Sequence, residues 1–360
     1  MKHWHETAAI LGQASRLAAA GVRSAVATVV RISGSAYRRP GAKFLVAEDG
    51  STAGGVSGGC LETDVRAIAL EVIREGAPRL LHYETGSDEE TVWGMGLGCE
   101  GAVDVFVAPA ADDLLTRTAP RLTELMTKRL PLAICTPVEG PHAGSTSVLG
   151  AGVWSGTTGS AELDAACAEH VPARLEDGKS ALERIGGESV FVDILRPPPT
   201  LFLFGAGDDA RPLAALAAEA GFSVTVVDHR RAYLTPERFP PPARLVLRRP
   251  QDGVADLGLD RRSFVVIQMH ALQHDRDWMR AVDEEPVAYV GLLGPRARKE
   301  HILQQLGLGD GERLFAPVGL DLGADGPEQV AISIVSEMLA VQAGRRPDHL
   351  RDKRGGIHDG

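Results

Sequence analysis

Two of the four cysteines in this 360-residue chain stand in glycine-rich segments. Cys60 ends the segment 54–60, which reads GGVSGGC, and Cys99 ends the segment 93–99, which reads WGMGLGC. Glycine permits tight turns in which backbone N–H groups approach a ligand, and a cysteine thiolate is a soft sulfur donor. We therefore interpret Cys60 and Cys99 as candidate catalytic residues and metal ligands, on the condition that the two turns converge.

The helix expected after Cys60 gives this thiol a specific environment. Unpaired N–H groups and the dipole at a helix N-terminus favour thiolate over thiol. The competing interpretation is a small buried cysteine that fills space, which is the commoner role of a free thiol. Backbone donors for a bound cofactor are expected from the glycines beside the two cysteines, which are Gly58, Gly59, Gly96 and Gly98.

Two other interpretations of these segments fail. Residues 55–59 match the G-x-S-x-G pattern of a hydrolase nucleophile elbow, but such an elbow sits on an already built parallel sheet, and few elements precede it here. A structural zinc site needs four ligands, and no histidine or further cysteine stands nearby at the usual spacing. Cys135, within an apolar strand, and Cys167, on a helix, are predicted to be structural.

A second kind of glycine turn, GAGDDA at residues 205–210, follows an apolar strand and opens a helix. Gly205 and Gly207 fit a turn that brings backbone N–H groups to a phosphate at the helix N-terminus. Asp228 stands about 20 residues further on, where an acid meets a ribose hydroxyl in dinucleotide-binding proteins. Arg230 beside it favours a phosphorylated ligand instead. A turn of this kind can also serve packing alone.

His270 and Asp275 are the evident acid–base pair of the C-terminal half. His270 follows the strand expected at 264–268, and Asp275 stands at the start of the next helix. Ligands of open α/β sheets bind outside the carboxyl ends of the strands, so both residues are candidate catalytic groups. The alternative is a surface histidine, with Asp275 as a helix cap.

The elements that must hold these turns divide into two domains and a tail. The prolines at 197–199 continue neither a helix nor a central strand, so they separate residues 1–195 from 200–345, and a polar tail occupies 346–360. Beyond 200, short apolar strands alternate with amphipathic helices, which predicts an α/β fold with a Rossmann-like, doubly wound parallel sheet. Strands are expected at 201–204, 223–227, 245–247, 264–268, 287–291 and 314–316, and helices at 209–220, 275–283, 296–306 and 327–343.

Residues 1–195 mix the two element types less regularly, which predicts an α+β domain. The segment 140–187 gives little signal beyond turns. Helices are expected near 6–20, 60–75 and 111–128, and strands near 24–31, 43–47, 79–84, 102–107, 131–136 and 189–195.

Composition excludes several classes of protein. The 38 Lys and Arg residues stand against 48 Asp and Glu, and a net charge of −10 argues against nucleic acid as a partner. Apolar residues make up 44% of the chain, as in an ordinary globular protein. No apolar run is long enough to span a membrane, and four scattered cysteines form no disulfide framework, so we expect a cytoplasmic protein.

The same segments resemble the xanthine dehydrogenase accessory protein family of the XdhC/CoxI type. The order of the motifs is that of the family, and the resemblance runs from about residue 7 to residue 345. The matching motifs are PGAK at 40–43, residues 54–60 with Glu62, residues 93–101, the 205–210 turn, Asp228-His229-Arg230 with Tyr233 and Phe239, residues 289–296 and residues 317–323.

This resemblance implies a chaperone that binds the molybdenum–pterin cofactor, supports its sulfuration by a cysteine desulfurase, and delivers it to a molybdenum hydroxylase apoenzyme such as xanthine dehydrogenase. It implies that Cys60 and Cys99 lie at the cofactor or sulfur site, and that the Rossmann domain takes a nucleotide or the pterin phosphate. Two positions depart from the family. Ala271 follows His270 where the family often has Asn or Asp, and Asp208 replaces a His or Pro.

Two alternatives to the chaperone stay open, and a homodimer is a further hypothesis. One alternative is an NAD(P)- or nucleotide-dependent enzyme of the Rossmann type, although no Tyr-x-x-x-Lys pair follows the 205–210 turn. The other is a non-catalytic assembly module that needs no reactive cysteine.

Overall fold

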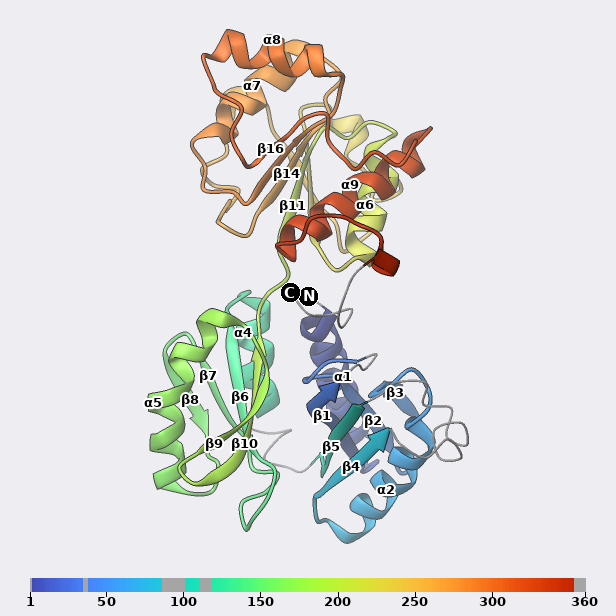
Figure 1. Cartoon of the computed structure of the whole chain (residues 1–360), viewed down its shortest axis with the longest axis vertical. Coiled ribbons are helices and arrows are strands. Elements are labelled where there is room, and N and C mark those ends of the chain that lie inside the picture. Colours follow the sequence, from blue (N-terminus) through green and yellow to red (C-terminus); the bar gives the residue numbers. More distant parts are fainter. Residues whose placement is uncertain (1, 35–37, 86–100, 111–117, 353–360) are drawn as a thin grey trace. The chain divides into compact units, whose positions relative to one another are not determined.

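The computed structural model describes residues 2–34, 38–85, 101–110 and 118–352. The chain folds as two compact units, the first of which reaches Pro197 while the second begins at Pro198 (Figure 1). No helix in these ranges is both long and apolar enough to cross a membrane.

The N-terminal unit begins with α1 (Lys2–Ala19) and a five-stranded antiparallel sheet in the order β3-β2-β1-β5-β4. Helix α2 (Glu62–Glu75) packs Val65, Ala69 and Val72 against this sheet, because these residues recur on one face of the helix. Gly76 ends α2 in the left-handed conformation. The strands are β1 (Ser24–Gly34), β2 (Lys43–Ala47), β3 (Thr52–Gly54), β4 (Arg79–Thr85) and β5 (Gly101–Pro109).

A second antiparallel sheet, in the order β8-β7-β6-β10-β9, completes this unit. The strands are β6 (Leu132–Pro137), β7 (Ser147–Gly150), β8 (Val153–Gly156), β9 (Ala181–Ile185) and β10 (Glu188–Leu195), and the helices of this part are α4 (Ala119–Thr127) and α5 (Ala161–Asp177). The expectation of little beyond turns at 140–187 was therefore wrong. Strands of four or five residues are too short to show a clear period, and Pro172 interrupts the helical pattern of α5.

The two N-terminal sheets meet through apolar and charged side chains. Val30 and Phe106 from the first sheet pack with Phe191 from the second. The buried ammonium group of Lys43 on β2 is paired with the buried carboxylate of Asp193 on β10. With antiparallel sheets and separate helices, the unit is the α+β fold that the sequence predicted.

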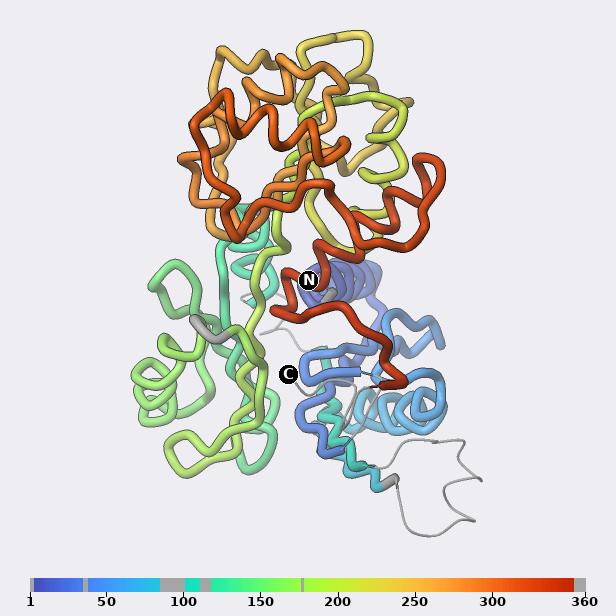
Figure 2. The backbone as a smooth tube through the Cα atoms, turned by 45° about the horizontal axis from the view of Figure 1, so that its top comes forward, coloured from blue at the N-terminus to red at the C-terminus, as the bar shows by residue number. Residues whose placement is uncertain are grey.

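The C-terminal unit is the predicted Rossmann-like parallel sheet, in the order β13-β12-β11-β14-β15-β16. Helices α7 and α8 lie on one side of the sheet, and α6 and α9 lie together on the other (Figure 1). Figure 2 traces the backbone of this unit, which the yellow-green to red part of the colour scale marks. The elements are β11 (Thr200–Phe204), α6 (Ala210–Glu219), β12 (Ser223–Asp228), β13 (Arg244–Leu247), β14 (Phe264–Ile267), α7 (Leu272–Asp283), β15 (Tyr289–Leu292), α8 (Arg296–Leu306), β16 (Leu314–Phe315) and α9 (Pro327–Gln342).

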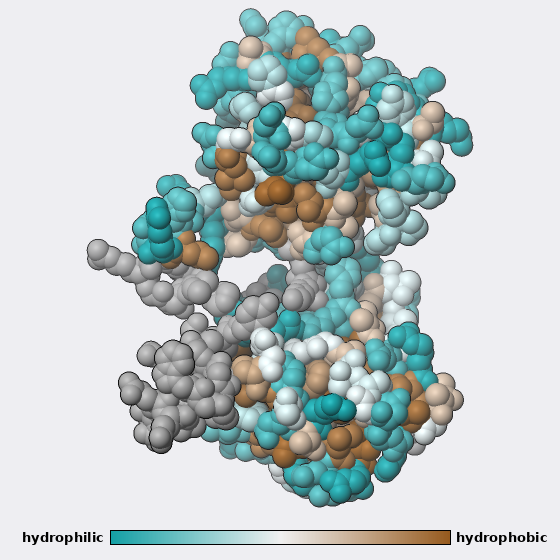
Figure 3. Space-filling model, turned by 90° about the vertical axis from the view of Figure 1, so that its right-hand side faces the viewer, coloured by the Kyte–Doolittle hydropathy of each residue, from teal (hydrophilic) through white to brown (hydrophobic). Residues whose placement is uncertain are grey.

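This strand order has a topological switch point between β11 and β14, where chain connections leave in opposite directions. Ligands of doubly wound sheets bind in the crevice at that point. The core of the sheet is dominated by large apolar residues such as Phe204 and Trp278, whose ring centroids lie 4.3 Å apart. Hydrophilic side chains cover most of the visible face of this unit (Figure 3).

Candidate functional site

The 54–60 turn joins β3 to α2 and requires glycine at its first position. Gly54 has a φ of +77°, and a Cβ atom there would lie 2.3 Å from the carbonyl oxygen of Lys43. The next amide, that of Gly55, donates a hydrogen bond of 2.8 Å to the same carbonyl. Glycine therefore lets the backbone fold closely against β2 before α2 begins.

Ser57 and Glu62 close this turn on itself. One carboxylate oxygen of Glu62 accepts hydrogen bonds from the amides of Ser57 at 2.8 Å and Val56 at 3.1 Å, and the other accepts from the Ser57 hydroxyl. The Ser57 oxygen in turn accepts from the amides of Gly59 and Leu61, each at 3.1 Å. Burial opposes ionisation of Glu62, but the bonds from Ser57 and Val56 hold its pKa below the usual value.

Cys60 is exposed at the end of this braced turn, two residues before the start of α2. The amides of Gly58 and Cys60 donate to no protein acceptor within the described chain. The amide of Gly59, which was predicted to serve a cofactor, already donates to Ser57. The turn thus presents a thiol together with two amides.

The other cysteines differ in their surroundings. Cys135 on β6 and Cys167 on α5 are buried in one core cluster, in agreement with the structural role predicted for them. A hydrogen bond from the Cys135 thiol lowers the pKa of Cys167. Cys99, Gly96 and Gly98 lie outside the described residues, so convergence of the two cysteine turns stays a prediction. No group of three or more His, Cys, Asp or Glu residues that could hold a metal occurs in the described ranges.

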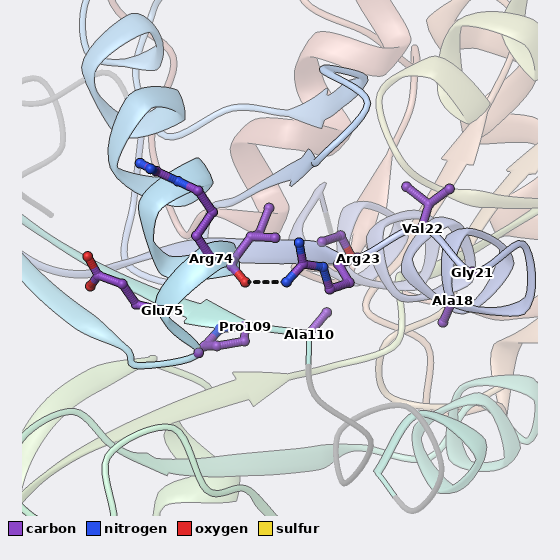
Figure 4. A pocket seen from close by; sticks show the side chains of 11 residues that line it. Ala18, Gly21, Val22, Arg23, Arg74, Glu75, Pro109 and Ala110 are labelled. Carbon is purple, nitrogen blue, oxygen red and sulfur yellow. Dashed lines mark hydrogen bonds between the residues drawn. The ribbon is translucent and has the colours of Figure 1, made fainter.

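A hollow of about 540 Å³ lies elsewhere in this unit, between the ends of α1, α2 and β5 (Figure 4). Arg23 crosses it and donates a hydrogen bond of 3.2 Å to the carbonyl oxygen of Ile73. None of the predicted site residues lines this hollow. This hollow is therefore not the site that the sequence predicted.

The 205–210 turn lies at the switch point of the parallel sheet. Gly205 has a φ of +121°, and a Cβ atom there would lie 2.5 Å from the carbonyl oxygen of Gln268. The amides of Gly207, Asp208 and Asp209, just before α6, donate to no protein acceptor within the described chain. Three free amides at a helix N-terminus are suited to an anionic group.

Asp228, the predicted ribose-binding acid, is fully buried at the end of β12. Its carboxylate accepts hydrogen bonds from the amides of Ala206 at 2.7 Å and Arg230 at 2.8 Å, and from the Arg230 guanidinium at 2.8 and 3.0 Å. Burial raises the pKa of this carboxyl, but the bonds from Arg230 and Ala206 outweigh burial and lower the pKa. Both predicted binding residues, Asp228 and Arg230, are thus paired with each other.

His270 and Asp275 have separate partners. His270 has a φ of +56°, and its Nε2 lies 2.7 Å from a carboxylate oxygen of Asp209. Asp275 is fully buried, where it accepts from the Met269 amide at 2.9 Å and the Arg298 guanidinium at 2.6 Å. Burial raises the pKa of Asp275, and these two bonds oppose that shift. The hydrogen-bonded acid of His270 is therefore Asp209, on the glycine turn.

Two arrangements escaped sequence reasoning. Arg230 and Arg238 both lie over the Tyr233 ring, with guanidinium carbons 4.0 and 5.0 Å from its centroid. The second is the pair of Lys43 and Asp193, which are 150 residues apart. A lysine at the start of the apolar strand KFLVA was a usable signal for the second, because a buried ammonium group needs a carboxylate partner.

Fold and site define a class of α/β proteins in which an α+β unit with an exposed cysteine turn precedes a Rossmann-type unit. Residues 201–338 match the XdhC Rossmann domain, and residues 17–84 match the XdhC and CoxI family. The chain belongs to this XdhC and CoxI family.

Relatives and a solved structure agree with this membership. The chain is 30% identical over 321 residues to a probable xanthine dehydrogenase subunit from Bacillus subtilis, a match that covers 87% of this chain and 92% of that protein. It is 25% identical over 367 residues to the "Molybdenum cofactor insertion chaperone PaoD" of Escherichia coli, covering 96% and 95% of the two chains. The crystal structure of a xanthine dehydrogenase from Bacillus halodurans superposes with a TM-score of 0.78 at 28% identity, covering 93% of this chain and 96% of that one.

Proposed function

We propose that this chain is an accessory chaperone of a molybdenum hydroxylase. It binds the molybdenum–pterin cofactor, supports its sulfuration and inserts it into an apoenzyme such as xanthine dehydrogenase. The family and the name of the Escherichia coli relative, a molybdenum cofactor insertion chaperone, support a role in maturation of molybdenum enzymes. The observation that carries the proposal is the exposed Cys60 at the end of a turn braced by Ser57 and Glu62.

In this proposal Cys60 supplies a soft sulfur ligand to the molybdenum of the bound cofactor, and Cys99 supplies a second. The braced turn fixes the backbone on which the Cys60 thiol stands, so the sulfur meets its ligand without first ordering a loop. The free amides of Gly58 and Cys60 add two hydrogen-bond donors beside it.

In this proposal the two domains carry different parts of the function. Residues 1–195 carry the cysteine turn, and residues 200–345 carry the 205–210 turn, which binds a phosphate of the cofactor or of a nucleotide such as NAD(P). A cysteine desulfurase supplies the sulfur while the chaperone holds the cofactor, and the chaperone works as a homodimer. An oxidoreductase would need an acid–base pair facing a substrate, whereas Asp275 is bonded to Arg298 and is fully buried.

The test is the pterin content of the full-length protein purified from cells that make the cofactor, read as oxidised-pterin fluorescence per chain. We expect pterin in the wild type and clearly less in Cys60→Ala and in Cys99→Ala. Cys167→Ala is the matched control, because it removes a buried thiol from the same unit. Wild-type protein without pterin, or equal loading of both cysteine variants and the control, would overturn the proposal.

A further inference from the structure

The carboxylate of Asp228 is already fully engaged. It is completely buried, and the Ala206 amide, the Arg230 amide and the Arg230 guanidinium all donate to it. In dinucleotide-binding proteins this acid accepts the hydroxyls of an unphosphorylated ribose. A ribose diol would need free acceptor oxygens on Asp228, and Arg230 is already bonded to them.

Two guanidinium groups gather at the same place. The Arg230 and Arg238 side chains, 37% and 24% exposed, lie against the ring of Tyr233, which is itself partly exposed. Guanidinium groups stacked on an aromatic ring keep their N–H groups in the plane available to a further acceptor.

Several donors of this pair lack a partner. The Nη1 of Arg230 donates to no protein acceptor within the described residues, because the Nε and Nη2 of this side chain make all of its bonds to Asp228. The Nε of Arg238 is buried and unpartnered, although its Nη2 bonds the Ala206 carbonyl oxygen at 3.0 Å and Asp208 at 2.9 Å. A buried guanidinium donor without an acceptor carries a desolvation cost that an acceptor oxygen of a ligand would offset.

The two acids of the glycine turn are each bonded to a neighbouring side chain. Asp208 is paired with Arg238, and Asp209 with His270. The amides of Gly207, Asp208 and Asp209 are free, so donors surround the turn from its backbone and from the arginines of the neighbouring segment.

We infer that Arg230 and Arg238, stacked on Tyr233, select ligands that carry a phosphomonoester over the same ligands without it. The inference rests on the proposed function, in which the 205–210 turn takes a phosphorylated ligand, and it deepens that proposal by naming the group that is read. A phosphomonoester offers the acceptor oxygens and the negative charge that a pair of guanidinium groups recognises. The 2′-phosphate of an adenine dinucleotide and the terminal phosphate of a pterin both have this chemistry.

Calorimetric titration of the cofactor-free, full-length chain with two matched pairs of probes tests the inference. One pair is NADP⁺ and NAD⁺, and the other is 6-hydroxymethylpterin phosphate and 6-hydroxymethylpterin. We expect the phosphorylated member of one pair to bind about tenfold more tightly or better, as loss of one charge-assisted hydrogen bond would predict. The pair that discriminates identifies the source of the phosphate.

Variants separate recognition from structure. Arg230→Lys keeps a charge beside Asp228 but loses the planar fork, and Arg238→Gln leaves Asp228 untouched. Both should reduce the affinity of the phosphorylated probe toward that of its partner. Arg231→Gln, which makes the same change of charge as Arg238→Gln at an exposed neighbour, should leave both affinities unchanged. Equal binding within each pair would overturn the inference. Measurable and equal binding of NADP⁺ and NAD⁺ would still leave the phosphate role of the turn standing, because both carry the pyrophosphate. Binding of no probe would overturn both.

Discussion

The 54–60 turn and the 205–210 turn share a plan of strand, glycine-rich turn and helix, yet they expose different chemical groups. In the first, the side chains of Glu62 and Ser57 accept hydrogen bonds from the amides of Val56, Ser57, Gly59 and Leu61. The group that this turn exposes is the Cys60 thiol. In the second, the three amides before α6 are free, and the acids nearby are bonded to arginine or histidine side chains.

The difference originates in the placement of the bracing carboxylate. Glu62 stands in the first turn of α2, only five residues after Ser57, so it folds back on its own turn. Asp228 reaches the other turn from the next strand and takes only the Ala206 amide. A glycine-rich turn before a helix is therefore not by itself an anion site, because a local carboxylate can occupy its donors first.

The largest expected effect is on the second turn. Arg230→Ala leaves the buried Asp228 without its guanidinium partner, and we expect a loss of about 3 kcal/mol in the free energy of unfolding, the lower end for a broken buried pair because Arg230 is partly exposed. Arg231→Ala should change this free energy by less than about 0.5 kcal/mol. Denaturant unfolding measures both, and equal losses would show that Asp228 does not depend on Arg230.

The next largest effects on stability are expected from alanine substitutions at one glycine of each turn. Gly205→Ala combines a left-handed backbone with a Cβ contact of 2.5 Å to the Gln268 carbonyl oxygen, so we expect a loss of about 2 kcal/mol or more. Gly59→Ala has a φ of +115° but open space around the new Cβ, and should cost about 1 kcal/mol. A larger loss for Gly59→Ala in thermal unfolding would contradict this ranking.

Glu62→Gln should loosen the first turn alone. The amide keeps one acceptor oxygen but loses the charge that strengthens the bonds from Ser57 and Val56, so we expect a loss of about 1 kcal/mol. Pterin-probe affinities of the 205–210 turn should stay unchanged in this variant. A shift in those affinities as large as that caused by Arg238→Gln would contradict the claim that Glu62 acts on the 54–60 turn alone.

The smallest expected effect is the pH dependence of the contribution that Glu62 makes to stability. The pKa of Glu62 is lower in the folded chain than its ordinary value of about 4.3, so its contribution to stability is present above that value and is lost as the pH falls through the folded pKa. The difference in thermal midpoint between wild type and Glu62→Gln should therefore shrink on acidification. A difference that stays constant from pH 6 to pH 3 would mean that another group braces the turn.

Sequence reasoning succeeded where neighbours along the chain determine the structure. The parallel sheet followed from strands that alternate with amphipathic helices, and the end of β12 at Asp228 followed from the apolar run before it. The pairing of Asp228 with Arg230 was not predicted, although the residues are two apart, because the sequence does not show which side-chain donors fill a carboxylate.

Pairings between distant segments escaped prediction for another reason. His270 meets Asp209 across 61 residues, and Lys43 meets Asp193 across 150, so no local pattern connects either pair. In 140–187, strands of four or five residues carry too few positions to show a period of two, and only the assembled sheet orders them.

X-ray absorption at the molybdenum K-edge of the cofactor-loaded protein tests the proposed role of Cys60 most directly. Wild type, Cys60→Ala and Cys167→Ala would be compared at equal molybdenum content. We predict that Cys60→Ala loses one sulfur neighbour of the molybdenum, while Cys167→Ala keeps the wild-type number. The same number of sulfur neighbours in all three proteins would contradict the assignment of Cys60 as a ligand of the bound cofactor.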